Sequence, residues 1–390
     1  MMKKFDVIVV GGGYVGLSFA GMLAQAGFQA AVIEKRHFAT KKISGEPSRL
    51  LAINTYSCKM FAQNKLLTSI RALGQSINHI RVVDYNSTAF LDFAPEEINQ
   101  ANFGYMVEEH DLGNALYSKL NKNPNLTVIE GAGVDTLDVE PSHVCISLAG
   151  GKISAPLVVA ADGRHSLIRA LTGIEHHRHN YGQHAVVCDV AHELDHLGIA
   201  VEKFMPTGPF AILPKRGGFS SSIVWTLPED QHDALKTLSN EEITDLIQER
   251  FGGYLGKVRI DSKLRSFKLE LVVAEEYYSE RVALLGDALH AIHPLAGQGM
   301  NLSLRDANTL TQLLVTQRSL GLDLGSEHML KEYRKLREAD NHLMIEATDK
   351  LNRLFSNDFI PLKLARRVGL KLVNNAIPLK KAFMQYASGL

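Results

Sequence analysis

The N-terminal part of the chain carries the clearest hydrophobic pattern. A run of apolar, mostly β-branched residues over 5–10 leads into a cluster of glycines, and an apolar pattern with helical spacing then continues to about Ala26. A second apolar run ends at Glu34. This order of strand, glycine turn, helix and strand predicts a βαβ unit with parallel strands.

The pattern changes after this unit. We expect a helix near 54–63, a β-hairpin over 80–93, and further helix and strand patterns up to about residue 160. From about 180 to 275 the segments are rich in β-type alternation, and only then does an apolar strand return before Gly286. The nucleotide-type fold is therefore predicted to be discontinuous, with a sheet lobe inserted.

Composition and charge narrow the picture. The chain has 390 residues, of which 45% are hydrophobic, so it can bury a large core and is expected to form more than one lobe. Lys plus Arg and Asp plus Glu both number 42, so no overall field favours nucleic acid, and no nucleic-acid partner is expected. Three widely spaced cysteines (Cys58, Cys145 and Cys188) suit a reducing compartment, and the expected location is cytoplasmic.

The glycine turn of the βαβ unit has the spacing of a dinucleotide site. Its three glycines allow a tight turn, close approach of the backbone to a pyrophosphate, and close packing of helix and strand. Glu34 follows Gly16 by 18 residues and ends the second strand, where a carboxylate can accept hydrogen bonds from a ribose. The alternative is a turn that merely packs. The expected binding residues of this unit are Gly11, Gly13, Tyr14, Val15, Gly16, Glu34 and Lys35.

The same carboxylate narrows the choice of dinucleotide. Glu34 argues against a 2′-phosphate, which leaves FAD or NAD. An NAD dehydrogenase would normally complete its sheet with a second nucleotide-binding half, whereas this chain continues with the hairpin and the sheet-rich insertion. This organisation favours FAD.

Three further stretches carry a resemblance to a known family. "GGGYVG", "AADGRHS" and "LLGDALHAIHPLAGQGMN" resemble the class A flavoprotein aromatic hydroxylases, which are single-component monooxygenases. "HPLAGQGMNLSLRD" resembles more narrowly the signature of the ubiquinone-biosynthesis hydroxylases, and the C-terminal "YRKLREADNHLMIEATDKLNRLFSND" is also similar to that family. Ser303 stands where the family pattern has Gly.

The resemblance implies a fold class. It predicts an α/β protein with a discontinuous FAD domain of the glutathione-reductase type, which is Rossmann-like, an inserted β-sheet substrate lobe and a C-terminal helical segment. We expect the FAD domain at 1–70, 100–175 and 276–330, the lobe at 71–99 and 176–275, and the C-terminal helices at 331–390.

The stretch from 286 to 301 is predicted to hold the flavin. A strand ending at Gly286 can offer Asp287 to the ribityl hydroxyls, and "GQGMN" opens a helix whose free backbone N–H groups suit the electron-rich edge of the ring. The residues expected there are Gly286, Asp287, Gly297, Gly299, Met300 and Asn301.

Other site residues follow from the resemblance. It implies Pro294 over the flavin face, Arg49 beside the pyrophosphate and ring, Glu109 on the ribityl chain, Val134 at the adenine, and Asp162 near the pyrophosphate. An N-terminal helix cap is the alternative role of Asp162. The candidate catalytic residues are Pro294, His293 and Arg49.

The resemblance also implies an activity. The family hydroxylates polyprenylated phenols in ubiquinone biosynthesis with FAD, NAD(P)H as co-substrate and O₂, through a flavin C4a-hydroperoxide, and other proteins of that pathway are candidate partners. The inserted lobe, with "FAILP" and "SSIVWTLP", then forms an apolar wall over the flavin, although plain core is the alternative. Two other functions stay open: a flavin-dependent reductase or dehydrogenase of an isoprenoid, and a non-catalytic flavoprotein subunit.

The histidines and the C-terminal segment bear on metal binding and membrane contact. No Cys, Asp or Glu completes a ligand set with His290 and His293, and the "HHRH" run at 176–179 lacks a complete set as well, so no metal is expected. The segment from Pro361 onwards has a helical pattern with one apolar and one basic face and a later pair of lysines. It predicts either peripheral contact with the inner membrane or a helix packed on the FAD domain. The residues concerned are Leu364, Ala365, Val368 and Leu372, and Lys363, Arg366, Arg367, Lys371, Lys380 and Lys381.

Overall fold

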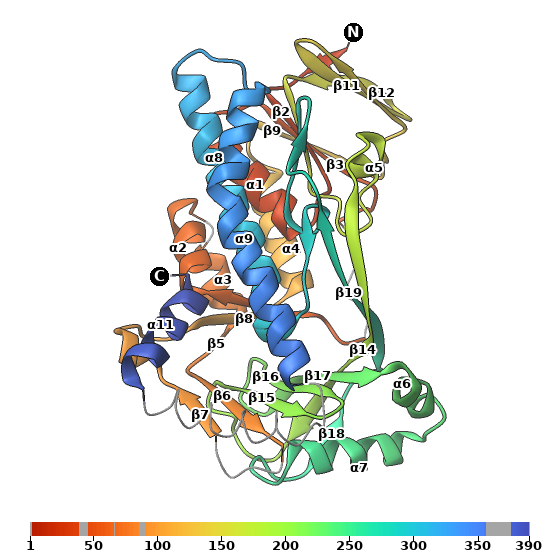
Figure 1. The fold of residues 1–390 in the computed structure, drawn as a ribbon, viewed down its shortest axis with the longest axis vertical. Helices are drawn as coiled ribbons and strands as arrows, with labels where there is room; N and C mark the ends of the chain where they lie inside the picture. The colour runs from red at the N-terminus through yellow and green to blue at the C-terminus, as the bar shows by residue number, and fades with distance from the viewer. Residues whose placement is uncertain (1, 39–45, 66, 86–89, 356–375, 390) are drawn as a thin grey trace.

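The computed structural model describes residues 2–38, 46–65, 67–85, 90–355 and 376–389. In Figure 1 a mostly parallel sheet occupies the upper part of the molecule and a second sheet occupies the lower part. Two long helices run beside the upper part, and one of them extends to the lower sheet.

The βαβ unit at the N-terminus is present. Strand β2 (Val7–Val10) pairs in parallel with β3 (Ala30–Glu34), and every residue of both strands is buried because their side chains are apolar on both faces of the sheet up to Glu34. Helix α1 (Tyr14–Gln25) makes the crossover between them.

Segments distant in sequence complete the upper sheet. Strand β13 (Leu157–Ala160) pairs with β2 on one side and with β21 (Val282–Leu284) on the other, so residues near 160 and 284 end at the same edge as Val10. The order of the six strands is β20 (Tyr278–Ser279), β21 (Val282–Leu284), β13 (Leu157–Ala160), β2, β3 and β9 (Leu126–Glu130).

Helices and a small sheet cover this layer. Helix α1 packs against α4 (Glu109–Leu120) and α8 (Gln298–Ser319) on one face. A four-stranded sheet contacts the opposite side through its second and third strands. It consists of β1 (Lys3–Lys4), β12 (Gly151–Ala155), β11 (His143–Leu148) and β10 (Thr136–Glu140).

The lower sheet has its own core. Buried side chains of its strands pack against α6 (Glu229–Leu235) and α7 (Asn240–Phe251), and Trp225 lies within this core. The sheet comprises β22 (His290–Ala291), β19 (Arg265–Ala274), β14 (His176–His192), β17 (Ser220–Pro228), β16 (Gly208–Pro214), β15 (Ile199–Met205), β6 (His79–Asp84) and β7 (Phe90–Phe93), with β18 (Val258–Ile260) paired to β14.

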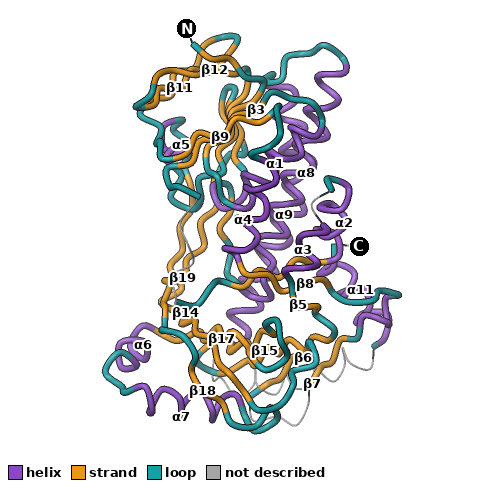
Figure 2. The backbone as a smooth tube through the Cα atoms, turned by 180° about the vertical axis from the view of Figure 1, so that it is seen from behind, coloured by secondary structure: helices purple, strands orange, loops and turns teal. Residues whose placement is uncertain are grey.

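The two parts are joined by long strands and a small third sheet. Strands β14 and β19 run from the lower part to the upper one, as both views show (Figures 1 and 2). The third sheet contains β4 (Leu50–Asn54), β8 (Gly104–Glu108) and β5 (Gln75–Ser76), with α2 (Thr55–Gln63) and α3 (Leu67–Leu73) beside it. A short helix, α5 (Leu167–Leu171), follows β13.

Two C-terminal helices pack on other elements. Helix α9 (Glu327–Phe355) lies along α8 and reaches β16. Helix α11 (Ile377–Ser388) lies beside the short helix η1 (Pro95–Ile98). The expected domain limits stay a prediction, but β5, assigned to the lobe, pairs with β8, and β22, assigned to the FAD domain, pairs with β19.

The predicted amphipathic tail can be placed only in part. Residues 361–375 lie outside the described residues, so its two faces cannot be compared with the structure. Lys380 is an exception to the expected free basic surface: it is buried, its Nζ lies 2.6 Å from Glu97 Oε1, and its ammonium group lies near the ring of Phe93. The Glu97 carboxylate compensates the cost of burying this charge. Within the described ranges, every helix is too short or too polar to cross a bilayer.

Candidate cofactor and substrate site

A single cavity of about 2000 Å³ connects the upper and lower parts of the molecule. It begins at the glycine turn before α1, passes the start of α8, and ends against the lower sheet and α11. Its volume exceeds the roughly 300–1,000 Å³ of an ordinary small-molecule pocket, so it has room for a dinucleotide and a second molecule.

The glycine turn leaves one face open. A Cβ on Gly11, which has φ of +106°, would lie 2.3 Å from the Ala161 carbonyl oxygen, and one on Gly16 would lie 2.0 Å from the Gly11 oxygen. A Cβ on Gly13, in contrast, would meet no atom within 4 Å, because this position faces the cavity. The first turn of α1 has no acidic residue and no side-chain cap. The turn therefore fits a phosphate placed at the helix N-terminus.

Glu34 is held in place by backbone donors. Gly12 N donates to its Oε2 over 2.8 Å, and Arg36 N donates to its Oε1 over 2.9 Å. Its side chain lines the cavity, and a carboxylate has further lone pairs for ribose hydroxyls. Two other residues that were predicted to bind the dinucleotide do not line the cavity: Lys35, which is exposed, and Val134.

Four side chains from distant parts of the sequence meet in the middle of the cavity. Tyr14 begins α1, Arg49 precedes β4, Glu109 begins α4, and Asp287 lies in the short helix η2 (Gly286–Ala288). Burial raises the pKa of the Tyr14 phenol, and the charge of Arg49 opposes this rise. The negative charges of Asp287 and Glu109 raise the pKa of the same phenol further. Mixed charges are thus gathered beside the open glycine turn.

The start of α8 borders the same space. Gly297, Gly299 and Met300 line the cavity, and Gly297 has φ of +62°, where a Cβ would lie 2.9 Å from that of Ala52. No side chain caps this helix. Its first N–H groups are therefore available to a ligand at the cavity wall.

Asn301 has a bracing role in the structure. Its Oδ1 accepts hydrogen bonds from Asn54 N and Ser57 Oγ, and its Nδ2 donates to Ala52 O over 2.8 Å. The side chain is buried and ties α8 to β4 and α2. The sequence pattern placed Asn301 near the flavin but did not reveal this bracing.

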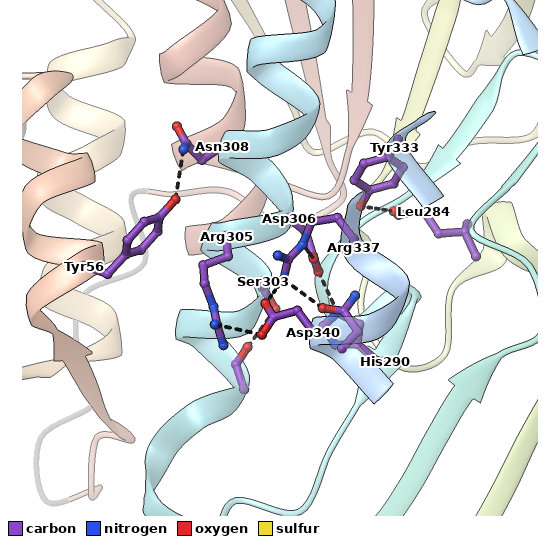
Figure 3. Close-up of polar contacts among 12 residues, drawn as sticks. Tyr56, Leu284, His290, Ser303, Arg305, Asp306, Asn308, Tyr333, Arg337 and Asp340 are labelled. Atoms are coloured by element: carbon purple, nitrogen blue, oxygen red, sulfur yellow. Dashed lines mark hydrogen bonds and ion pairs between the residues drawn. The ribbon is translucent and has the colours of Figure 1, made fainter. Parts of the chain in front are cut away.

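A buried polar network links α8 to β22 and α9 (Figure 3). The Asp306 carboxylate in α8 contacts His290 Nε2 of β22 over 2.6 Å, and its other oxygen accepts from Arg337 Nε of α9 over 2.6 Å. Arg337 also donates to Asp340 and Asn341. Burial opposes ionisation of Asp306, but His290 and Arg337 lower its pKa overall. Removing one partner of such a pair typically costs about 3–5 kcal/mol, so this network fixes α8 and β22 relative to each other.

Asp162 acts as a helix cap. Its Oδ2 accepts from Leu167 N over 2.8 Å and from Ile168 N over 3.3 Å, at the start of α5. It does not line the cavity, although the following Arg164 does. The structure thus displays the capping alternative, and a pyrophosphate contact of Asp162 stays a prediction.

His293 and Pro294 lie on the loop between β22 and α8. Both line the cavity; His293 is 1% exposed, and neither ring nitrogen has a partner among the described residues. Burial lowers the pKa of His293 to about 4. Its ring packs edge-on against Tyr181, whose hydroxyl donates to Asp349 over 3.1 Å. The imidazole is therefore neutral near pH 7 and has free hydrogen-bonding capacity.

The cavity brings together most, but not all, of the predicted residues. It is lined by Gly13, Tyr14, Glu34, Arg49, Glu109, Asp287, His293, Pro294, Gly297, Gly299, Met300 and Asn301. Gly11, Val15, Gly16 and Gly286 shape the turns around it, and a Cβ on Gly286 would lie 3.3 Å from Val15. Within the described ranges no cluster of three or more metal-ligating side chains occurs.

Sequence reasoning missed Arg36, Glu202 and Arg265, which also line the cavity. Arg36 follows the predicted acid by only two residues, which was a usable signal. The other two lie on strands whose inward face the sequence alone left ambiguous.

Comparisons with known proteins show the family to which the chain belongs. Residues 4–347 match the family model described as "FAD binding domain". In overall structure the chain is similar to the p-nitrophenol 4-monooxygenase PnpA of Pseudomonas putida, with a TM-score of 0.82, 21% identity and 99% of each chain covered. The likeness to PnpA shows the fold, and the family match shows that the chain belongs to the family of proteins that share this FAD binding domain.

Its relatives define a narrower group. It is 42% identical to the ubiquinone hydroxylase UbiL of Rhodospirillum rubrum, covering 99% of this chain and 90% of that protein. It is 33% identical to the 3-demethoxyubiquinol 3-hydroxylase of Escherichia coli (99% and 98%) and 31% identical to the human mitochondrial ubiquinone biosynthesis monooxygenase COQ6 (98% and 92%). The chain belongs to the ubiquinone-biosynthesis hydroxylase family.

Proposed function

We propose that this protein hydroxylates a polyprenylated phenol in ubiquinone biosynthesis, with FAD as cofactor and NAD(P)H and O₂ as co-substrates. The observation that carries the proposal is the single cavity, in which a dinucleotide-type turn and a large apolar compartment open into each other. The family relationship supports the same reaction class.

The polar end of the cavity suits FAD. Gly13 and the first turn of α1 would receive the pyrophosphate, Glu34 the ribose, and Asp287 with Glu109 the ribityl chain. Arg49 would lie beside the ring system. The N-terminus of α8 would stabilise negative charge at the edge of the reduced ring.

The apolar end suits an isoprenoid chain. It is bounded by β6 and β7 and by one side of α11, none of which presents an ionic group to this part of the cavity in the described residues. Burying a methylene there contributes about 0.8 kcal/mol, so the chain itself would supply affinity. The lining residues are Ile80, Val82, Leu91, Phe93, Leu379, Phe383 and Met384.

Bound FAD would supply electron transfer from NAD(P)H and activation of O₂. The protein must then exclude water and orient the phenol ring. Leu295, which follows Pro294, packs against Phe204 of the lower sheet, and both line the cavity. Because burial keeps His293 neutral there, its imidazole can accept a hydrogen bond from a phenol or donate one to it at neutral pH.

Oxygen labelling tests the proposal. The holoprotein is incubated with NADH or NADPH, labelled O₂ and a prenylphenol, and we expect reductant oxidation to rise with the phenol and label to enter the ring. Reductant oxidation with label only in water or hydrogen peroxide, and an unchanged phenol, would contradict hydroxylation. Prenyl-chain reduction would instead identify a reductase, and a protein without FAD would identify a non-catalytic subunit.

A further inference from the structure

One carboxyl group interrupts the apolar wall of the cavity. Glu202 lies on β15, and Ala200 and Phe204, two residues before and after it, line the same cavity. In a strand these alternate residues share one face. In the sheet register Glu202 stands opposite Val82 of β6 and Ala211 of β16. Its neighbours on its own face are therefore apolar in all four directions.

Two apolar clusters fix its position in the cavity. On one side Ala200 belongs to a cluster with Met106 and Met384, toward α11. On the other side Phe204 packs against Leu295, the residue after Pro294. Glu202 thus lies between the compartment proposed for the isoprenoid chain and the loop proposed to cover the flavin.

The carboxyl has no protein partner in the part of the chain that the structure describes. Glu270 on β19 also lines the cavity, but it is paired with Arg178 over 2.7 Å. Burial is the cause that raises the pKa of Glu202, to about 7. A substantial fraction of this group is therefore protonated near neutrality, and a protonated carboxyl can both donate and accept a hydrogen bond.

We propose that Glu202 positions the substrate by a hydrogen bond to an oxygen substituent of its aromatic ring. This rests on the proposed function. Apolar contacts alone allow a flat ring to rotate within its plane, whereas a polar anchor fixes which ring edge faces the flavin. Glu202 is a specificity-determining residue that selects for an oxygenated ring and orients it.

Ligand binding to the oxidised holoprotein tests this role without turnover. A short-chain prenylphenol and the matched prenylbenzene, which lacks the hydroxyl, are titrated while the flavin absorbance is followed. We expect the wild type to prefer the phenol, and Glu202→Leu to lower this preference about tenfold, as expected for one lost hydrogen bond. Glu202→Gln keeps a polar partner and should retain part of the preference.

Two controls separate positioning from general damage. FAD content and affinity for the prenylbenzene should stay within about twofold in Glu202→Leu, since only the hydroxyl contact is removed. Glu140→Gln changes an exposed carboxylate on β10 and should bind both ligands as the wild type does. An unchanged phenol preference in Glu202→Leu overturns the assignment.

The two proposals fail in different ways. If the wild type incorporates labelled oxygen but Glu202→Leu retains the phenol preference, only the role of Glu202 is wrong. If the wild type binds neither ligand and shows no phenol-stimulated reductant oxidation, the proposed function is wrong, and the role of Glu202 that rests on it falls too.

Discussion

The two ends of the cavity are built in opposite ways. At the cofactor end, glycines bring backbone atoms together, and Glu34 is fixed by two backbone N–H groups. At the substrate end, alternate residues of strands from separate parts of the chain form an apolar wall that contains Glu202. On the loop beside it, both ring nitrogens of His293 have no partner among the described residues. Polar groups that are already hydrogen-bonded within the protein suit a cofactor that stays bound. Polar groups without protein partners in an apolar wall suit a ligand that binds and dissociates in each turnover.

A valine at Gly13 should have the largest effect and tests the cofactor end. A Cβ at this position meets no protein atom within 4 Å, so the fold should tolerate the larger side chain, which would extend into the space assigned to the pyrophosphate. We expect FAD affinity to fall at least about 100-fold, equivalent to about 2.7 kcal/mol. Flavin fluorescence after gel filtration measures the bound fraction.

The matched control is Gly150→Val, because a Cβ on Gly150 also meets nothing within 4 Å but lies away from the cavity. Full FAD content in both variants would show that the cofactor does not approach this turn. A Gly13→Val protein that fails to fold would show that the open side of the turn has another structural use.

Replacing His293 should have an intermediate effect and tests the substrate end. Burial lowers the pKa of His293 from 6.5 to about 4, so between these values the unfolded chain binds the proton that the folded chain does not. The contribution of His293 to the free energy of unfolding should therefore rise by an amount of order 3 kcal/mol as pH increases from about 4 to 6.5. The raised pKa of Glu202 gives the opposite slope, with stability lost as pH rises from 4.5 through about 7.

Comparing variants isolates the slope that His293 contributes. Urea unfolding of the FAD-loaded protein at pH 5 and pH 7 should show a smaller loss on acidification for His293→Leu than for the wild type. His342→Leu removes a histidine whose side chain is 75% exposed and should leave the wild-type difference intact. An equal acid sensitivity of wild type and His293→Leu would show that His293 is not desolvated as described.

The same contrast explains what the sequence could predict. The βαβ unit, Glu34 and the stretch from Gly286 to Asn301 are contiguous patterns whose chemistry depends on local geometry, and the cavity gathers most of their residues. Glu202 was not predicted because "IAVEKFM" has apolar residues on both faces of the strand, so its inward side depends on the partners β6 and β16. The Asp306 network joins three elements distant in sequence, which no local pattern reveals.

Replacing Ser303 by glycine should have the smallest effect and tests the boundary between the two ends. Ser303 Oγ donates to Gly299 O over 2.8 Å inside α8, and a Cβ on Gly286 would lie 3.5 Å from that of Ser303. Because Ser303 is buried and does not line the cavity, its side chain should affect the helix more than the cofactor.

Ser303→Gly should lower the free energy of unfolding by about 0.5–1 kcal/mol through added backbone freedom. FAD affinity should stay within about twofold, and Ser303→Ala, which keeps the Cβ, should retain most of the stability. Tighter FAD binding by tenfold or more in Ser303→Gly alone would show instead that the serine narrows the approach of the flavin through Gly286, and that the packing behind α8 controls both ends of the cavity.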